Sequence, residues 1–472
     1  MTVPNVLAER YASAAIRDVF DPVQRVIAER RLWIAVMRAQ AELGLDIPAA
    51  DIAAYEAVAE QVDLSSIAER ERISRHDVKA KIDEFSALAG VEHAHKGMTS
   101  RDLTENVEAM LTYRALEIIS DKAVSLLARW GEIAAKQASH VLVGRTHNVP
   151  AQPTTVGKRI AQFSEELLAA VAALDSVRDR FAIRGIKGPV GSQQDQLDLL
   201  GSPEAVDELE RRVAAELGVP KVLDAVGQVA PRSRDFEVIS ALVQLASGPA
   251  NLALQVRLMA GHDLATEGFA EGQVGSSAMP HKMNSRSCER VNGFQAILRG
   301  HLTMAANLAG DQWNEGDVSC SVVRRVVVPD AFFAIDGLLE TSLSIAAGLG
   351  FFPEVIDAEL QRYLPFVATP TLLAHGVRNG LGREEAHEII KEHAVSAALA
   401  MRSGAGSGVD LIEGLGTDVR FPGSAEELSA TIADPRALVG RVDAQIESIL
   451  ERIRILTESR PAAAAYNGSP IL

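Results

Sequence analysis

The sequence predicts an all-α protein built around a bundle of long helices. Apolar residues recur at the three- and four-residue spacing of an amphipathic helix in five long segments, whereas few stretches alternate as strands do. In the clearest segment this spacing runs from Val156 to Phe181, which is about seven helical turns. Long helices with such apolar stripes are typical of a helix bundle. The other four segments are residues 110–133, 236–264 (where Pro249 is expected to cause a kink), 291–308 and 326–349.

We predict three domains along the chain. The first has shorter helical patterns, at residues 23–43 and 50–72, and the third contains the Gly/Ser run 403–408, which predicts a surface loop. The central domain holds the long helices, and helices of this length are expected to bury their stripes against partner helices in other subunits. The N-terminal helical domain, the central long-helix bundle and the C-terminal helical domain are assigned to residues 1–106, 107–362 and 363–472.

The composition excludes several classes of function. The chain has 472 residues, with 47 Lys and Arg against 63 Asp and Glu, and its net charge is −16. Such a chain repels nucleic acid and anionic membranes, so neither is expected as a partner. Cys288 and Cys320 cannot form a disulfide framework, and two cysteines fit a reducing compartment. Charges interrupt every long apolar run, and Glu9 and Arg10 precede any apolar stretch. We therefore expect no signal peptide, no membrane span and a cytoplasmic protein.

The segment between Gly272 and Gly293 is the most informative for function. It reads GQVGSSAMPHKMNSRSCERVNG and lies between two long helical patterns. Glycine and serine alone would be typical of an interhelical linker. The tight group from Met279 to Asn284 has no such use and favours a chemical role.

This segment resembles the signature of the fumarase/aspartase superfamily, Gly-Ser-Ser-x-Met-Pro-x-Lys-x-Asn-Pro. Every specified residue agrees from Gly275 to Asn284, and Ser285 replaces the final proline. The resemblance implies the elimination of fumarate from a succinyl-substituted amine or alcohol, with Ser276 as the general base. Removing a proton beside a carboxylate creates an aci-carboxylate whose charge needs cations and donors. Lys282 and Asn284 are of the types that supply them.

Further segments resemble the adenylosuccinate lyase family within that superfamily. Arg10-Tyr11-Ala12-Ser13 is similar to a motif that contacts the nucleotide phosphate, and Arg75-His76-Asp77-Val78 is similar to a second substrate-binding motif. In the second motif, a guanidinium can bind phosphate, and a histidine held by Asp77 would have a fixed tautomer. In a third, Thr99 and Ser100 correspond to residues that bind a substrate carboxylate. Read alone, the first of these segments would be ordinary surface and the second a helix start.

Gly144-Arg145-Thr146-His147 is also similar to a motif of this family, in which the histidine is the usual general acid. An imidazole titrates near neutrality, so it can deliver a proton to the leaving nitrogen. The resemblance implies that Glu289 is the carboxylate that pairs with His147. Gly316 departs from the family, which often has arginine there. Further nucleotide- or substrate-binding positions implied by the resemblance are Gln228, Arg290, Ser321 and Arg325.

The resemblance implies conversion of adenylosuccinate to AMP, and of the succinylated aminoimidazole carboxamide ribotide to its product, in purine biosynthesis. It also implies a homotetramer whose active sites are shared between subunits. Two alternatives are another lyase of the superfamily, such as argininosuccinate lyase or a cycloisomerase, and a catalytically silent helical scaffold. His93 and His95 have the spacing of two metal ligands, but no third ligand follows at helical spacing. We predict no metal and no cofactor.

Overall fold

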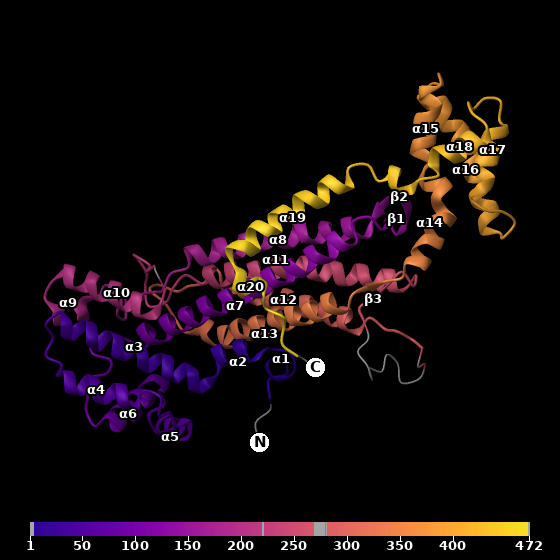
Figure 1. Cartoon of the computed structure of the whole chain (residues 1–472). Coiled ribbons are helices and arrows are strands. Elements are labelled where there is room, and N and C mark those ends of the chain that lie inside the picture. The colour runs from indigo at the N-terminus through magenta and orange to yellow at the C-terminus, as the bar shows by residue number, and fades with distance from the viewer. Residues whose placement is uncertain (1–3, 220, 269–278, 280, 471–472) are drawn as a thin grey trace.

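Five long helices form the centre of an elongated molecule (Figure 1). The computed structural model describes residues 4–219, 221–268, 279 and 281–470. Helix α7 packs against α8 and α13, and α11 packs against α8, α12 and α13. The prediction of long helices is confirmed, and α11 and α13 continue through Pro249 and Pro329. Their bounds are α7 (Ser100–Lys136), α8 (Val156–Arg180), α11 (Ser233–Ala260), α12 (Arg286–Leu308) and α13 (Ser319–Gly348).

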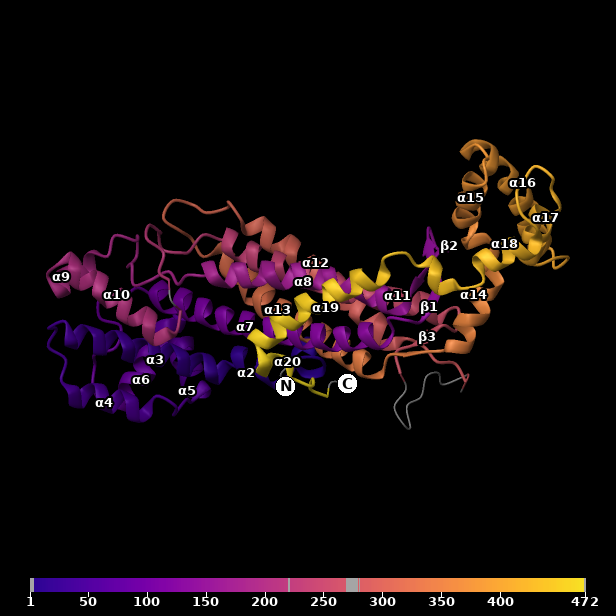
Figure 2. The same ribbon diagram turned by 45° about the horizontal axis from the view of Figure 1, so that its top comes forward.

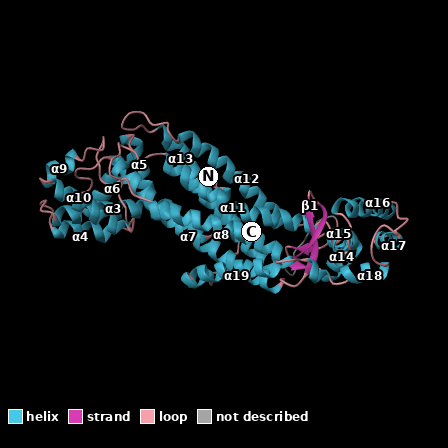
Figure 3. Ribbon diagram, turned by 90° about the horizontal axis from the view of Figure 1, so that it is seen from above, coloured by secondary structure: helices cyan, strands magenta, loops and turns pink. Residues whose placement is uncertain are grey.

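The fold is mostly helical, and the described residues also form two small antiparallel sheets. Strands β1 (Val141–Thr146) and β2 (Val149–Thr155) form a hairpin between α7 and α8. Strands β3 (Ala265–Thr266) and β4 (Gly350–Phe351) form the second sheet. Figure 3 shows the strands gathered at one end of the helical bundle. The hairpin escaped the sequence analysis because its two short strands interrupt an otherwise helical pattern.

Short helices cover the opposite end of the bundle, where α7 begins (Figure 1). The single helix predicted over residues 50–72 is two helices, because Asp63 accepts hydrogen bonds from the backbone N–H groups of Ser65 and Ser66 and starts a new one. The helices of this end and of the N-terminal segment are α1 (Val6–Arg10), α2 (Ala14–Phe20), α3 (Pro22–Glu42), α4 (Ala49–Val58), α5 (Leu64–Ser74), α6 (Asp77–Ala89), α9 (Gln194–Leu200) and α10 (Pro203–Leu217).

After the bundle, the chain forms a separate small core and then returns. Helices α15 to α18 bury their own apolar cluster, which includes Leu372, Leu411 and Leu428. Figure 2 shows α19 lying along the bundle, where it packs on α7 and α8. The run 403–408 lies between α16 and α17. The bounds are α14 (Pro353–Val367), α15 (Thr369–Arg378), α16 (Arg383–Arg402), α17 (Val409–Thr417), α18 (Ala425–Ile432), a 3₁₀ turn (Pro435–Leu438), α19 (Val442–Ser459) and α20 (Pro461–Ala464).

Domain boundaries at residues 106 and 362 stay predictions. The main hydrophobic core includes residues of the N-terminal helices, of the bundle and of α19. The first and last parts of the chain therefore share one core with the centre. Among the described helices, none is both long and apolar enough to cross a membrane.

Candidate active site

Predicted site residues gather at the end of the bundle where α7 begins. We call Arg75, His76, Asp77, Ser100 and Arg325 the N-terminal cluster. Arg75 ends α5 in the left-handed conformation, with a φ of 54°, and His76 is the N-cap of α6. His76 Nε2 lies 3.4 Å from Ser100 Oγ, and Arg325 Nη2 lies 3.6 Å from Asp77 Oδ2. The cluster therefore joins an imidazole, a hydroxyl and a guanidinium from three parts of the chain.

The start of α6 supplies a hydrogen bond that favours one tautomer of His76. The backbone N–H of Lys79 donates to His76 Nδ1 at 3.3 Å, whereas Asp77 Oδ1 is 3.7 Å from the same nitrogen. An Nδ1 that accepts a hydrogen bond leaves the proton of the neutral ring on Nε2. His76 can therefore donate from Nε2 on the side where Ser100 lies. The expectation that Asp77 holds this ring stays a prediction.

The buried ion pair Asp102–Arg184 connects two predicted substrate-binding segments. Both side chains have an exposed fraction of 0%. Asp102 Oδ2 accepts from the backbone N–H of Thr99 at 2.7 Å. Arg184 donates to Gly227 O from Nε at 3.1 Å and from Nη2 at 2.8 Å, next to Gln228. The pair thus fixes the start of α7 relative to the loop that carries Gln228. This ion pair could not be predicted, because neither residue stands out in a sequence motif.

Gln228 also explains the glycine at position 316. Its backbone N–H donates to Glu315 O at 2.6 Å, and Gly316 has a φ of 142°, which side chains rarely adopt. A Cβ at position 316 would lie 3.2 Å from Gln228 Cβ. This close contact favours glycine over the arginine of the family. Ser321 lies one helical turn before Arg325 on α13, at the same end of the bundle.

His147 lies at the tip of the β1–β2 hairpin. His147 and Asn148 have φ values of 52° and 62°, and Thr146 pairs with Val149, so the two form a type I′ turn. The base of the hairpin packs on α14, where Val143 shares a cluster with Leu360. Arg145 in β1 forms an ion pair with Glu359 of α14. A rigid support therefore presents an exposed imidazole at its tip.

Arg10, Tyr11 and Arg290 form a third group. The guanidinium carbons of Arg10 and Arg290 lie 5.8 Å and 5.6 Å from the centre of the Tyr11 ring. Tyr11 in turn makes an edge-to-face contact with Phe294 of α12, with ring centres 5.2 Å apart. Among the described residues, neither arginine forms an ion pair. Two cations held on one aromatic ring without a carboxylate are suited to bind an anion.

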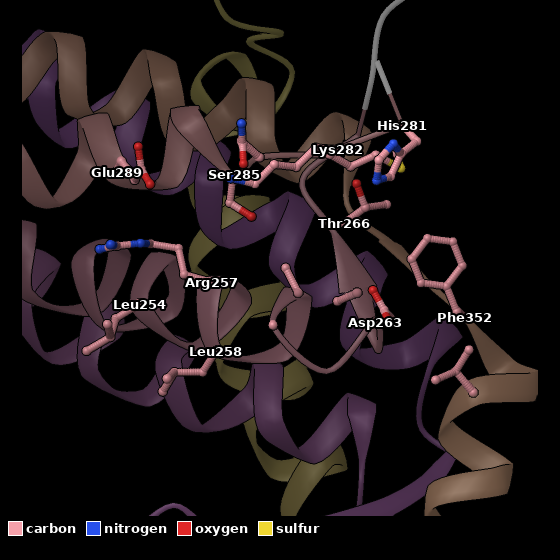
Figure 4. Close-up of a pocket in the computed structure, with 16 residues that line it drawn as sticks. Leu254, Arg257, Leu258, Asp263, Thr266, His281, Lys282, Ser285, Glu289 and Phe352 are labelled. Atoms are coloured by element: carbon pink, nitrogen blue, oxygen red, sulfur yellow. The ribbon is translucent and has the colours of Figure 1, made fainter. Parts of the chain in front are cut away.

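A cavity of about 740 Å³ opens beside Lys282 and the start of α12 (Figure 4). Lys282, Asn284 and Glu289 line it, as the resemblance implies for residues of one site. Phe352 supplies an apolar wall. Figure 4 shows Arg257 on α11 and Glu289 on α12 along one side of this cavity, with His281 and Lys282 at its edge. The titratable lining residues outside the predicted set are Arg257, Asp263 and His281. Of these, only His281 lies within a recognisable motif.

Among the described residues, the predicted acid His147 and its predicted partner Glu289 are not paired. Ser276 lies outside the described residues. Glu289 and His147 form no ion pair with each other among the contacts of the described chain, and His147 does not line the cavity. Their pairing stays a prediction.

The N-terminal cluster and the hairpin lie at opposite ends of α7 (Figure 1). This helix has 37 residues. At 1.5 Å per residue it is about 55 Å long. No nucleotide spans that distance, so the predicted residues cannot all serve one site within one chain.

The two histidines with metal-ligand spacing face different partners. His93 Nε2 lies 2.9 Å from Asp51 Oδ2, whereas His95 Nδ1 accepts from Trp33 Nε1 at 3.0 Å. Within the described ranges, no group of three or more His, Cys, Asp or Glu side chains is arranged to hold a metal ion.

Solved structures share this fold. A 3-carboxy-cis,cis-muconate lactonizing enzyme from Pseudomonas putida aligns with a TM-score of 0.82 at 21% identity, over 96% of this chain and all of that one. At this identity the likeness concerns the fold alone.

The comparison with related sequences identifies the family and not only the fold. A family model described as "Lyase" matches residues 19–300, and one described as "Adenylosuccinate lyase C-terminus" matches residues 365–449. An adenylosuccinate lyase from Saccharomyces cerevisiae is 33% identical over 94% of this chain and 93% of its own length. One from Schistosoma mansoni is 32% identical over 98% and 96%. The chain belongs to the adenylosuccinate lyase family.

Proposed function

We propose that the protein eliminates fumarate from adenylosuccinate to give AMP, and from the succinylated aminoimidazole carboxamide ribotide in the same way. The observation that carries the proposal is near full-length similarity to adenylosuccinate lyases, together with side chains suited to this elimination. We expect the enzyme to work in the cytoplasm without a metal or an organic cofactor.

The proton-transfer roles belong to Ser276 and His147. Ser276 removes the proton beside the succinyl carboxylate, and Lys282 and Asn284 stabilise the aci-carboxylate that forms. His147 protonates the leaving nitrogen, with Glu289 as its partner from another subunit. His76, whose Nε2 carries the donor proton, completes the catalytic set.

Binding roles follow from charge and position. Arg10 and Arg290, stacked on Tyr11, suit the phosphate of the nucleotide. Thr99 and Ser100 suit a carboxylate of the succinyl group. The remaining contacts are assigned to Arg75, Asp77, Gln228, Asn284, Ser321 and Arg325.

We further propose that the active site is shared between the subunits of a homotetramer. Helix α7, which is about 55 Å long, separates the N-terminal cluster from the hairpin, so a complete site needs more than one chain. Apolar side chains on the bundle support such packing. On α12, Ile297 and Met304 are 39% and 37% exposed. A Cβ at Gly293 or Gly300 would meet no atom within 4 Å, which leaves room for a neighbouring helix.

An assay with purified protein tests the reaction. Adenylosuccinate is supplied, and fumarate and AMP are measured together, with argininosuccinate as the competing substrate. We expect equal amounts of the two products, unchanged by exhaustive chelation. Turnover of argininosuccinate alone would favour the alternative lyase, and no turnover of either would favour the silent scaffold.

A further inference from the structure

Buried contacts hold the turn that carries Arg10 and Tyr11. Ser13, three residues after Arg10, is 4% exposed, and its backbone N–H donates to Asp336 Oδ2 at 2.6 Å. Its hydroxyl accepts from Lys122 Nζ at 2.7 Å. The next residue of α13, Gly337, lies so close that a Cβ there would be 3.0 Å from Tyr11 O. The position of the turn is therefore set by α13 and by Lys122 of α7.

Lys122 lies between two carboxylates of α13. Its Nζ forms an ion pair with Asp336 and lies 2.6 Å from Glu340 Oε1, and the three side chains are 4%, 0% and 0% exposed. We call Lys122, Asp336 and Glu340 the Lys122 cluster. Apolar residues of similar volume would hold α7 and α13 together equally well, so a buried ionic group of this kind is weak support for stability alone. Its directional bonds are suited to fixing a position.

Residues 466–469, far from Lys122 in the sequence, contact the Lys122 cluster. The Tyr466 hydroxyl donates to Glu340 Oε1 at 2.5 Å, and the backbone N–H of Ser469 donates to Glu340 Oε2 at 2.6 Å. Lys122 Nζ also lies 5.5 Å from the centre of the Tyr466 ring. Ser125 of α7 fixes the same segment by donating to Tyr466 O at 2.6 Å. One buried group thus connects residues 466–469 with the turn at residues 10–13.

We propose that Tyr466 and the Lys122 cluster are positioning residues for the turn Arg10–Ser13, and so set the affinity for the phosphate of the nucleotide. The inference rests on the proposed function, in which Arg10 and Arg290 contact that phosphate. Without the Tyr466 hydroxyl, Glu340 draws Lys122 away from Ser13, and the turn becomes less ordered. Because both guanidiniums stack on Tyr11, a less ordered Tyr11 weakens two cationic contacts at once.

Tyr466→Phe in the full-length protein is the direct test, because it keeps the ring beside Lys122 and removes only the hydroxyl. We expect the KM for adenylosuccinate and the inhibition constant of AMP to rise about fivefold, as for the loss of one hydrogen bond. The kcat and the inhibition constant of fumarate should stay unchanged, because the carboxylate-binding residues are elsewhere.

Arg460→Gln is the matched control. Arg460 attaches the same part of the chain to α7 through Asp121 and Ser120 without touching the Lys122 cluster. It should lower the melting temperature and leave AMP inhibition unchanged. If both variants weaken inhibition by AMP equally, the positioning role is overturned. If Tyr466→Phe does not fold, Ser125→Ala loosens the same segment and is measured in its place.

A double variant separates this inference from the proposed function. In the Arg10→Ala background, Tyr466→Phe should weaken AMP inhibition less than it does in the parent protein, because only the Arg290 contact on Tyr11 remains to be weakened. If Arg10→Ala itself leaves AMP inhibition unchanged, the phosphate role in the proposed function is wrong. If Arg10→Ala weakens inhibition by AMP but Tyr466→Phe alone does not, the positioning role is wrong while the proposed function stands.

Discussion

His95 shows how a single residue of this fold is kept in one charge state. Trp33 Nε1 donates to its Nδ1 at 3.0 Å, and burial, with His76 nearby, lowers the pKa of His95 from 6.5 to about 4. Because the folded pKa lies below the unfolded one, His95 contributes stability above pH 6.5 that is lost as the pH falls through 4. A shift of this size corresponds to about 3 kcal/mol.

We therefore expect His95→Gln to reduce the acid sensitivity of the protein. The glutamine oxygen can still accept from Trp33, but it does not titrate. The measurement is the loss of melting temperature between pH 7 and pH 4.5, which should be smaller for the variant than for the parent protein. An equal loss in both would show that His95 is not a source of the acid sensitivity.

Ser276 and Ser277 give a residue-scale test of the proposed base. Ser276→Ala should lower kcat by several orders of magnitude with little change in substrate affinity, because it removes the base and little else. Ser277→Ala should be milder. Single-turnover rates and equilibrium binding of adenylosuccinate separate the two effects. If Ser277→Ala lowers kcat more than Ser276→Ala does, the base is Ser277 and not Ser276.

Arg290 tests how an acidic protein binds an anion. Replacement by Ala should raise KM more than it lowers kcat, with a loss of about 1.5–3 kcal/mol for a charge-assisted hydrogen bond. Arg454→Ala, on the exposed face of α19, is the control and should leave KM unchanged. An Arg290→Ala enzyme that AMP inhibits as well as the parent would contradict the phosphate role.

At the scale of elements, the β1–β2 hairpin holds the proposed acid by a turn of defined geometry. Asn148 has a φ of 62°, which glycine adopts at no cost and valine does not. Asn148→Gly should therefore keep full activity. Asn148→Val should lower kcat while changing the melting temperature little, because the tip is exposed. The measurement is kcat beside thermal unfolding, and a fully active Asn148→Val enzyme would contradict the need for this turn.

The long helices were predictable because their apolar stripes repeat over many turns, as from Val156 to Phe181. The hairpin was not, since a His-Asn turn lacks the usual Asn-Gly signal. Candidate residues such as Lys282 and Glu289 could be predicted because they lie in or beside a motif. Asp102 and Arg184 could not, because they are joined only by folding and by contacts to backbone groups, which leave no pattern in the sequence.

At the scale of the whole molecule, the length of α7 supports the proposal that sites are assembled from several chains. His76→Ala and Ser276→Ala, each inactive alone, are mixed, dissociated mildly and allowed to reassemble. In the proposed shared site the two residues come from different subunits, so about a quarter of random sites should receive both intact side chains. Recovery of activity is measured beside native mass spectrometry. Mixed tetramers that stay inactive would contradict the shared site.

The late return of α19 affects how the chain folds during synthesis. Ile449 and Ile453 of α19 are buried against α7. A Cβ placed on Gly131 of α7 would lie 3.4 Å from Ile453 Cγ2. The face of α7 that they cover emerges from the ribosome about 300 residues before them. At roughly 5–20 residues per second, that apolar face waits about 15–60 s for its cover. Over this interval the apolar face of α7 lacks its cover, and a pause in translation before residue 442 prolongs this exposure.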